Sequence, residues 1–216
     1  MKLKNPLISL ISICLVSIFL FSFYLSDSRA SETDEAVAKI QKAYENIKDV
    51  SGGFVQKSRI KELKRTDTYK GRFYLKARGM KWEYGGPSPQ TVYVVGDKIV
   101  IYQKNEKQAF MSRFDSNAYG QAPIALLAGF GKISREFDVS MKGGRMLVLK
   151  PKGPMGNISY IELVPSGGEF PIEAVTIVDA LSNRVDIQLN DVKINTGLKD
   201  GFFEFSPPAG VGILRQ

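Results

Sequence analysis

The chain has 216 residues and a net charge of +8, and it contains no histidine and a single cysteine. Histidine is the commonest general base, and histidine and cysteine are the commonest zinc ligands. This composition excludes His-dependent hydrolases, zinc enzymes, haem proteins and iron–sulfur carriers. It favours a protein that is not an enzyme and that has no metal or cofactor. A hydrophobic fraction of 44% is typical of a globular domain with a buried core.

The N-terminal segment has the pattern of a secretory signal peptide. Lysines precede an uncharged apolar run at 7–25, and small residues end the segment at Ala30. We predict cleavage after Ala30, which leaves 31–216 as a single domain. The apolar run is also long enough for an uncleaved membrane anchor. A lipid-modified Cys14 is disfavoured because bulky Ile13 precedes it.

Export and the absence of cysteine from the mature chain together indicate the cellular compartment in which the protein works. The leader carries three of the basic residues and one of the acidic ones, so its removal lowers the net charge from +8 to +6. An exported protein without disulfide bonds is typical of a bacterial envelope, and we predict a periplasmic location. The basic residues form no cluster with interleaved aromatic residues, so we interpret them as solvated surface and expect no nucleic-acid partner.

The first element expected in the mature chain is an amphipathic helix over 34–48. Its apolar residues lie three and four positions apart, at Val37, Ile40, Tyr44 and Ile47. Thr33 is the expected N-cap, and Ser51-Gly52-Gly53 is the expected end of the helix.

The pattern then changes to short β runs separated by turn residues. We expect strands at 54–60, 69–75, 80–84, 91–95, 98–102, 109–113, 136–141, 145–150, 159–164, 171–179, 184–189 and 202–205. The connections are too short for parallel crossovers, so the sheet should be an antiparallel meander. Between the two series, the uncharged segment 121–130 predicts a second short helix.

A sheet of this size has more apolar face than two helices can cover, because a helix of about fifteen residues spans only about 22 Å. The sheet should therefore curl into a barrel or half-barrel. With this many strands its interior is too wide for its own side chains to fill, which predicts a pocket for an apolar ligand. The uncharged helix at 121–130 would cover that pocket as a lid.

Several motifs, in order along the mature chain, resemble one known family, the periplasmic outer-membrane lipoprotein carrier LolA. The motifs are Phe54-Val55-Gln56-Lys57, Gly71-Arg72-Phe73-Tyr74-Leu75-Lys76, Met80-Lys81-Trp82-Glu83-Tyr84 with Pro87, Gly96-Asp97 with Tyr102, Pro123-Ile124-Ala125-Leu126-Leu127, and Phe203-Glu204-Phe205-Ser206-Pro207-Pro208-Ala209-Gly210-Val211.

The resemblance implies a mainly β (α+β) fold, an incomplete antiparallel barrel of about eleven strands with a helical lid over an apolar cavity. It implies a monomeric carrier whose cavity binds the acyl chains of lipoproteins. The partners implied are an inner-membrane ABC transporter that releases lipoproteins and an outer-membrane receptor that accepts them.

The same resemblance, with the strand alternation, suggests site residues. We expect the acyl-chain cavity to be lined by Phe54, Phe73, Leu75, Met80, Trp82, Val94 and Ile101, and the lid to carry Pro123, Ile124, Leu126 and Leu127. In the family an arginine shortly before the tryptophan hydrogen-bonds to the lid. Here Lys76 occupies that position without a gap and Arg78 with a gap of one residue, so both are candidates for the latch.

Other functions on the same half-barrel remain open from the sequence: a carrier of a different envelope lipid, and a sensor or regulator that detects lipoproteins. An enzyme is disfavoured because the chain has no Gly-x-Ser-x-Gly elbow and no phosphate-binding glycine loop.

Overall fold

The computed structural model describes residues 24–77, 79–114, 127 and 132–215. One long helix, α2 (Tyr24–Glu45), precedes the strands, and two short helices are α4 (Ile133–Glu136) and the 3-10 helix η4 (Asp200–Phe203). The strands are β1 (Asp49–Ile60), β2 (Arg65–Lys76), β3 (Gly79–Tyr84), β4 (Gln90–Val95), β5 (Lys98–Gln103), β6 (Gln108–Arg113), β7 (Phe137–Lys142), β8 (Met146–Pro151), β9 (Ile158–Pro165), β10 (Ile172–Asp179), β11 (Arg184–Ile194) and β12 (Gly212–Arg215).

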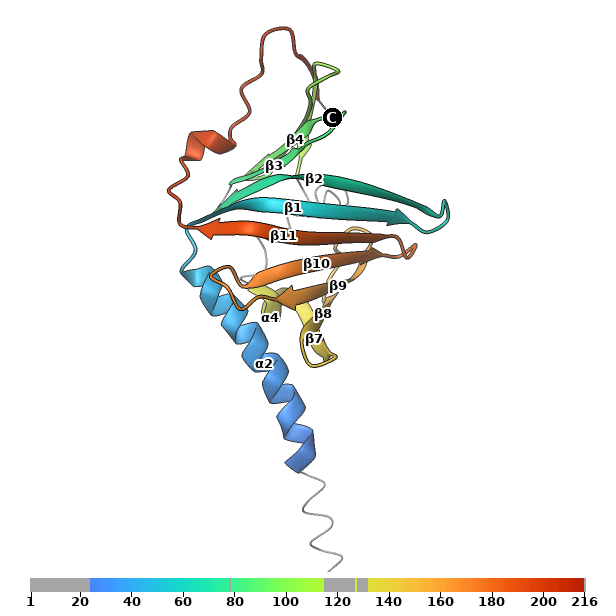
Figure 1. Cartoon of the computed structure of the whole chain (residues 1–216), viewed down its shortest axis with the longest axis vertical. Helices are drawn as coiled ribbons and strands as arrows, with labels where there is room; N and C mark the ends of the chain where they lie inside the picture. Colours follow the sequence, from blue (N-terminus) through green and yellow to red (C-terminus); the bar gives the residue numbers. More distant parts are fainter. Residues whose placement is uncertain (1–23, 78, 115–126, 128–131, 216) are drawn as a thin grey trace, which may run out of the picture.

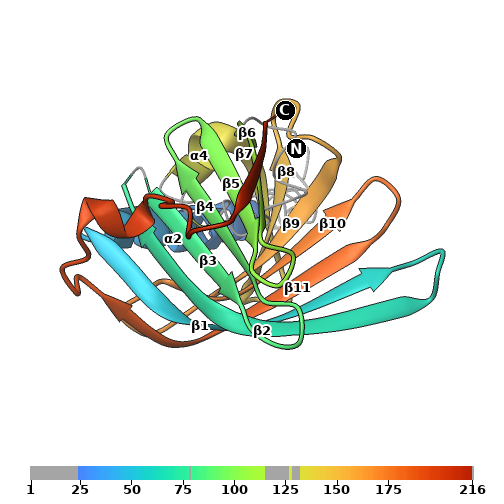
Figure 2. The ribbon, with the colours of Figure 1, turned by 90° about the horizontal axis from the view of Figure 1, so that it is seen from above.

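All the strands form one sheet in the order β12-β6-β5-β4-β3-β2-β1-β11-β10-β9-β8-β7. β1 and β11 meet in the middle, so β2–β6 extend to one side of the sheet, with the C-terminal β12 beyond β6, and β7–β10 extend to the other (Figure 1). The sheet is strongly curved, and no pairing joins its edge strands β7 and β12 in the described part of the chain (Figure 2). The predicted mainly β, unclosed architecture is confirmed.

Alternation along each strand places apolar side chains on one face, and these form a continuous buried cluster. In β3, for example, Met80 and Trp82 are buried, whereas Lys81 lies on the opposite face. Val37 and Ile40 of α2 belong to the same cluster, and α2 lies on the concave side of the sheet in Figure 2. The core is therefore the inside of the curve.

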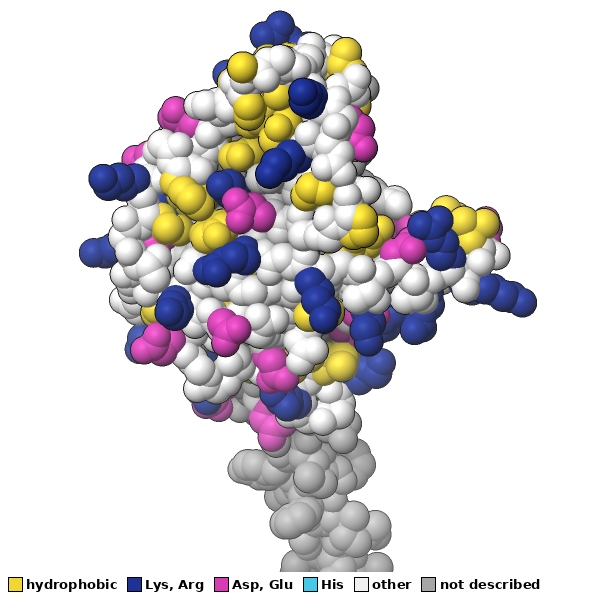
Figure 3. Space-filling view, turned by 45° about the horizontal axis from the view of Figure 1, so that its top comes forward, with side chains coloured by type: hydrophobic (Ala, Val, Ile, Leu, Met, Phe, Trp, Pro, Cys, Tyr) yellow, Lys and Arg dark blue, Asp and Glu magenta, His cyan; other side chains and the backbone are white. Residues whose placement is uncertain are grey.

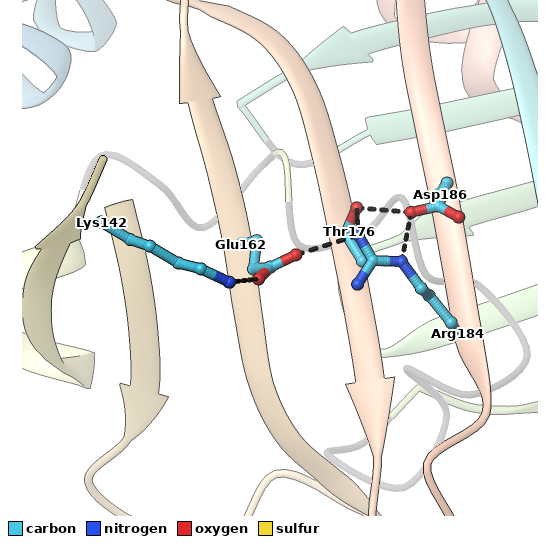
Figure 4. Close-up of polar contacts among 5 residues, drawn as sticks. All are labelled: Lys142, Glu162, Thr176, Arg184 and Asp186. Carbon is cyan, nitrogen blue, oxygen red and sulfur yellow. Dashed lines mark hydrogen bonds and ion pairs between the residues drawn. The ribbon is translucent and has the colours of Figure 1, made fainter. Parts of the chain in front are cut away.

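A polar network on the other face joins the strands of the second half (Figure 4). Glu162 of β9 is only 5% exposed. Its carboxylate accepts hydrogen bonds from Lys142 Nζ at 3.1 Å and from Arg184 Nη2 at 2.9 Å. Asp186 accepts from Arg184 Nε and from Thr176 Oγ1, both at 2.7 Å. The network connects the side chains of four strands, β7, β9, β10 and β11.

The first helix differs from its predicted bounds of 34–48. It begins at Tyr24 and ends at Glu45. Thr33 therefore lies inside the helix and does not cap it. No glycine or proline occurs between residues 24 and 33, so nothing in the sequence interrupts the helix before the predicted start.

Ser51-Gly52-Gly53, the predicted end of that helix, lies instead in β1. A Cβ atom on Gly52 would be 2.8 Å from Cε1 of Phe73 on the neighbouring strand β2. The prediction of a helix stop at this glycine pair is wrong, because here Gly52 serves close side-chain packing.

The C-terminal segment departs most from the prediction. The expected strand at 202–205 overlaps η4, and the last strand is β12, which pairs in parallel with β6. The sheet therefore has twelve strands and one parallel pair, where about eleven antiparallel strands were expected. Phe202 and Phe205 pack against tyrosine rings of β2, β4 and β5, so their aromatic side chains serve packing and not strand pairing.

In the part of the chain for which the structure gives coordinates, no helix has the length and apolar composition needed to cross a membrane. Residues 1–23 of the predicted leader, and with them most of the alternative anchor at 7–25, lie outside the described residues, whereas residues 24–30 form the start of α2.

Candidate functional site

Three aromatic side chains form the centre of the concave face. The rings of Phe54 and Trp82 stack with centroids 3.8 Å apart, and Phe73 contacts Trp82 at 5.3 Å. All three are at most 1% exposed. Gly71 makes this arrangement possible, because a Cβ atom there would lie 2.7 Å from Cε1 of Phe54.

The other side chains predicted to line the cavity lie in the same cluster. Leu75, Met80 and Val94 are buried, and Ile101 packs against them while partly buried. The fold thus brings all the predicted cavity residues together on the inner face of β1–β5. Their role in binding a ligand stays a prediction.

Polar groups border this apolar cluster on the inner face. The Nε1–H group of Trp82 is buried and has no hydrogen-bond partner in the described part of the chain. Nearby, the Tyr84 hydroxyl donates to Oε1 of Gln56 at 3.2 Å, and Gln56 Nε2 donates to Ser58 Oγ at 3.0 Å. Burial raises the pKa of Tyr84 to about 12. These polar residues were not predicted as site residues, although Gln56 follows Phe54 by two positions and therefore shares its strand face.

Of the predicted lid residues, only Leu127 is described; Pro123, Ile124 and Leu126 lie outside the described residues. Leu127 is 1% exposed. Its backbone carbonyl accepts a hydrogen bond of 2.8 Å from the hydroxyl of Tyr44 on α2. Burial raises the pKa of that hydroxyl, so it stays protonated and able to donate.

A pocket of about 270 Å³ opens where α2, β1 and β2 meet below Leu127. Its lining residues include Tyr44, Val50, Leu75 and Lys76. Leu127, Leu75 and Lys76, which were predicted as lid, cavity and latch residues, all line this one pocket. Tyr44 was expected to be an apolar core position, and its hydroxyl was missed.

Of the two latch candidates, only Lys76 is described. Lys76 Nζ donates to the carbonyl of Leu198 at 2.7 Å and pairs with Asp200 at 2.7 Å, so these polar contacts are with the C-terminal segment. Arg78 lies outside the described residues. The latch assignment stays a prediction.

A buried carboxylate next to the pocket holds the same C-terminal segment. Asp49 is 3% exposed and accepts hydrogen bonds from the Thr196 amide and hydroxyl at 2.7 and 2.8 Å. It also accepts from the amides of Gly197 and Leu198. Desolvation opposes ionisation, but these hydrogen bonds outweigh it and lower the pKa of Asp49.

The chain has relatives among known families and proteins. A family described as outer membrane lipoprotein carrier protein LolA matches residues 45–206. The outer-membrane lipoprotein carrier protein of Neisseria meningitidis is 29% identical over 201 residues, which cover 91% of this chain and 95% of that protein. The protein of the same name from Cupriavidus pinatubonensis is 27% identical over 215 residues, covering 96% and 98%.

Among solved structures, an uncharacterized conserved protein from Thermus thermophilus superimposes with a TM-score of 0.55. It is 14% identical and covers 85% of this chain and 98% of its own, so it supports the fold alone. The family match, in contrast, includes the aromatic cluster, the predicted lid and nearly all of the sheet. The chain therefore belongs to the outer membrane lipoprotein carrier protein LolA family.

Proposed function

We propose that the protein is a monomeric periplasmic carrier that binds the acyl chains of lipoproteins and shuttles lipoproteins from the inner to the outer membrane. It takes them from an inner-membrane lipoprotein-releasing ABC transporter and delivers them to an outer-membrane receptor, if one is present. The leader directs export and is removed after Ala30. The protein binds and releases lipoproteins without a covalent step, in keeping with a family of carriers and not of enzymes.

The observation that carries this proposal is the apolar inner face of an unclosed sheet. Each methylene moved from water into an apolar site gains about 0.8 kcal/mol, or about 12 kcal/mol for one sixteen-carbon chain. A lipoprotein therefore needs a soluble protein that hides its acyl chains in water. A sheet whose described edge strands are not hydrogen-bonded to each other can widen to admit them without breaking its strand pairs.

In this proposal the acyl chains lie against the aromatic cluster of Phe54, Phe73 and Trp82 and the aliphatic side chains around it. Met80 contributes a flexible, polarizable side chain that can adapt its shape to different acyl chains. Leu127 covers the interior, and the Tyr44 hydroxyl holds its backbone in the closed position. Lys76 or Arg78 contributes to the closure as the latch.

The test is the substitution Leu127→Glu, which puts a charge where the cover contacts the apolar interior. We expect it to abolish retention of acylated proteins when the periplasmic form is isolated from growing cells and its bound molecules are identified by mass spectrometry. Leu127→Met is the matched control, since it keeps an apolar side chain of similar volume. Circular dichroism and thermal unfolding verify that both variants are folded.

Normal loading of the Leu127→Glu variant would refute the role of this residue. A purified protein that carries phospholipid or another envelope lipid, and no acylated protein, would show that the same interior serves a different cargo.

A further inference from the structure

Two neighbouring hairpin tips display leucine side chains to solvent. Leu63 lies in the turn between β1 and β2 and is 67% exposed, and Leu181 lies in the turn between β10 and β11 and is 64% exposed. The Lys61 amide donates to Oδ1 of Asn183 at 3.0 Å, so the two turns contact each other. We call residues 61–64 and 180–183 the paired tips.

Hydrogen bonds within each turn hold these leucines outward. In the first turn the Lys64 amide donates to the carbonyl of Lys61 at 3.2 Å. In the second, Oδ1 of Asp179 accepts from the amides of Leu181 and Asn183 at 2.9 and 2.8 Å. The leucines are therefore presented by structured turns.

The turn geometry does not require a leucine. The hairpin between β5 and β6 has a turn of the same form, in which the Lys107 amide donates to the carbonyl of Lys104. Lys64 and Lys107 share a positive φ of 49°. The third position of that turn is the charged Glu106, where the first turn has Leu63. A polar residue fits this fold equally well, so Leu63 needs another explanation.

Basic side chains surround the first leucine. Residues 59–65 read Arg-Ile-Lys-Glu-Leu-Lys-Arg, with four cations and one anion. Arg65 pairs with Asp67 at 2.9 Å, whereas neither Lys61 nor Lys64 forms an ion pair within the described residues. Figure 3 shows apolar and basic side chains gathered on the projection formed by the β1–β2 hairpin.

We propose that the paired tips dock the protein on the surface of an anionic lipid bilayer. Leu63 and Leu181 enter the interfacial region, and Lys61 and Lys64 lie at the level of the lipid phosphates. The surface of a bilayer has an apolar layer directly beneath a layer of phosphates. Leucines beside lysines with long flexible side chains match these two layers. Leu63 and Leu181 lie at the tips of projecting hairpins. This shape suits insertion into a deformable lipid surface better than docking on a folded protein.

The experiment measures co-sedimentation of the exported protein, isolated from the periplasm, with vesicles. Phosphatidylethanolamine–phosphatidylglycerol vesicles are the anionic probe, and phosphatidylcholine vesicles are the neutral one. We expect binding to the anionic vesicles that weakens as salt is added. The Lys61→Gln/Lys64→Gln variant should lower the partition coefficient about thirtyfold, the loss expected for two surface lysines. The Leu63→Ser/Leu181→Ser variant should lower it at least about tenfold.

Matched controls separate the paired tips from general surface properties. Lys104→Gln/Lys107→Gln removes the same charge from the same kind of turn, and Leu214→Ser removes a leucine that is 47% exposed in β12. Both controls should bind as the unchanged protein does. These substitutions lie outside the apolar interior, so the result does not depend on whether that interior carries acyl chains.

The proposal is overturned if the unchanged protein does not bind anionic vesicles, or if the leucine variant binds them with an unchanged partition coefficient. It is also overturned if the tip variants bind vesicles normally but lose a complex with another envelope protein. That outcome would make the paired tips a protein-docking surface.

Discussion

Asp49 shows how a single buried carboxylate can organise one end of the molecule. It lies at the start of β1, and its partners Thr196, Gly197 and Leu198 come from the segment after β11. The neighbouring Asn195 strengthens the same junction, since its side chain accepts from the Lys48 amide at 2.7 Å. These bonds fix the connection after α2, the first strand and the C-terminal segment relative to one another.

Replacement of Asp49 by Asn should lower the free energy of unfolding by about 2 kcal/mol at neutral pH, because charged acceptors form stronger hydrogen bonds. The folded-state pKa of Asp49 lies below its ordinary value of 3.8. Its stabilising contribution is therefore complete above the unfolded-state pKa, and it is lost as the pH falls through the folded-state value.

Urea unfolding of the unchanged protein and of Asp49→Asn at a series of pH values should give curves that converge below about pH 4. The control is Asp138→Asn, at an exposed carboxylate. It should give almost the same free energy of unfolding as the unchanged protein at every pH. A gap between the curves that stays constant down to the lowest pH would contradict this assignment.

At the scale of elements, the polar network of Figure 4 links the outer face of β7–β11. Glu162 is at its centre, paired with Lys142 and Arg184. Glu162 is the buried member of the network, and loss of its charge weakens its hydrogen bonds from Lys142 and Arg184, because charge-assisted hydrogen bonds are stronger than neutral ones.

We expect Glu162→Gln to lower the free energy of unfolding by about 2 kcal/mol, the usual contribution of hydrogen bonds to a charged group, measured by urea unfolding. Glu173→Gln is the matched control on the adjacent strand. Glu173 pairs with Arg145, but its side chain is 45% exposed, so its loss should cost less than about 1 kcal/mol. Equal effects of the two substitutions would show that burial of Glu162 adds nothing to the network.

Three consecutive strands were among the elements predicted best. The predicted ranges 80–84, 91–95 and 98–102 lie within the observed β3, β4 and β5, because runs rich in β-branched and aromatic residues end there at turn residues. The segment 202–205 is also rich in aromatic residues, but these pack on the outer face of the sheet. A local composition typical of strands does not reveal whether the backbone finds a partner strand.

For the molecule as a whole, the proposed function makes access to the interior depend on how Tyr44 of α2 meets Leu127 of the proposed cover. The contact between them that the structure describes is the hydrogen bond from Tyr44 to the Leu127 carbonyl. Tyr44 also packs edge-on against Phe170 at 5.8 Å, so its ring is held independently of its hydroxyl. The hydroxyl can therefore be removed without displacing the ring.

Tyr44→Phe should speed the uptake of a fluorescent fatty acid about fivefold, the effect of losing one hydrogen bond of ordinary strength. Stopped-flow fluorescence measures this rate, and Tyr160→Phe on the outward side of β9 is the control. Unchanged uptake by the Tyr44→Phe variant would argue that this bond does not restrain the cover.

The sequence by itself determined the family, the β-rich class and the set of apolar residues that face inward, since local alternation and motif order depend only on neighbours along the chain. The tertiary structure decided the contacts between distant segments: Tyr44 with Leu127, Asp49 with Thr196, and Lys61 with Asn183. Each joins residues more than eighty positions apart, and no local pattern specifies which polar groups meet once the sheet curves. The paired tips likewise become one surface only because β1 and β11 are neighbours in the folded sheet.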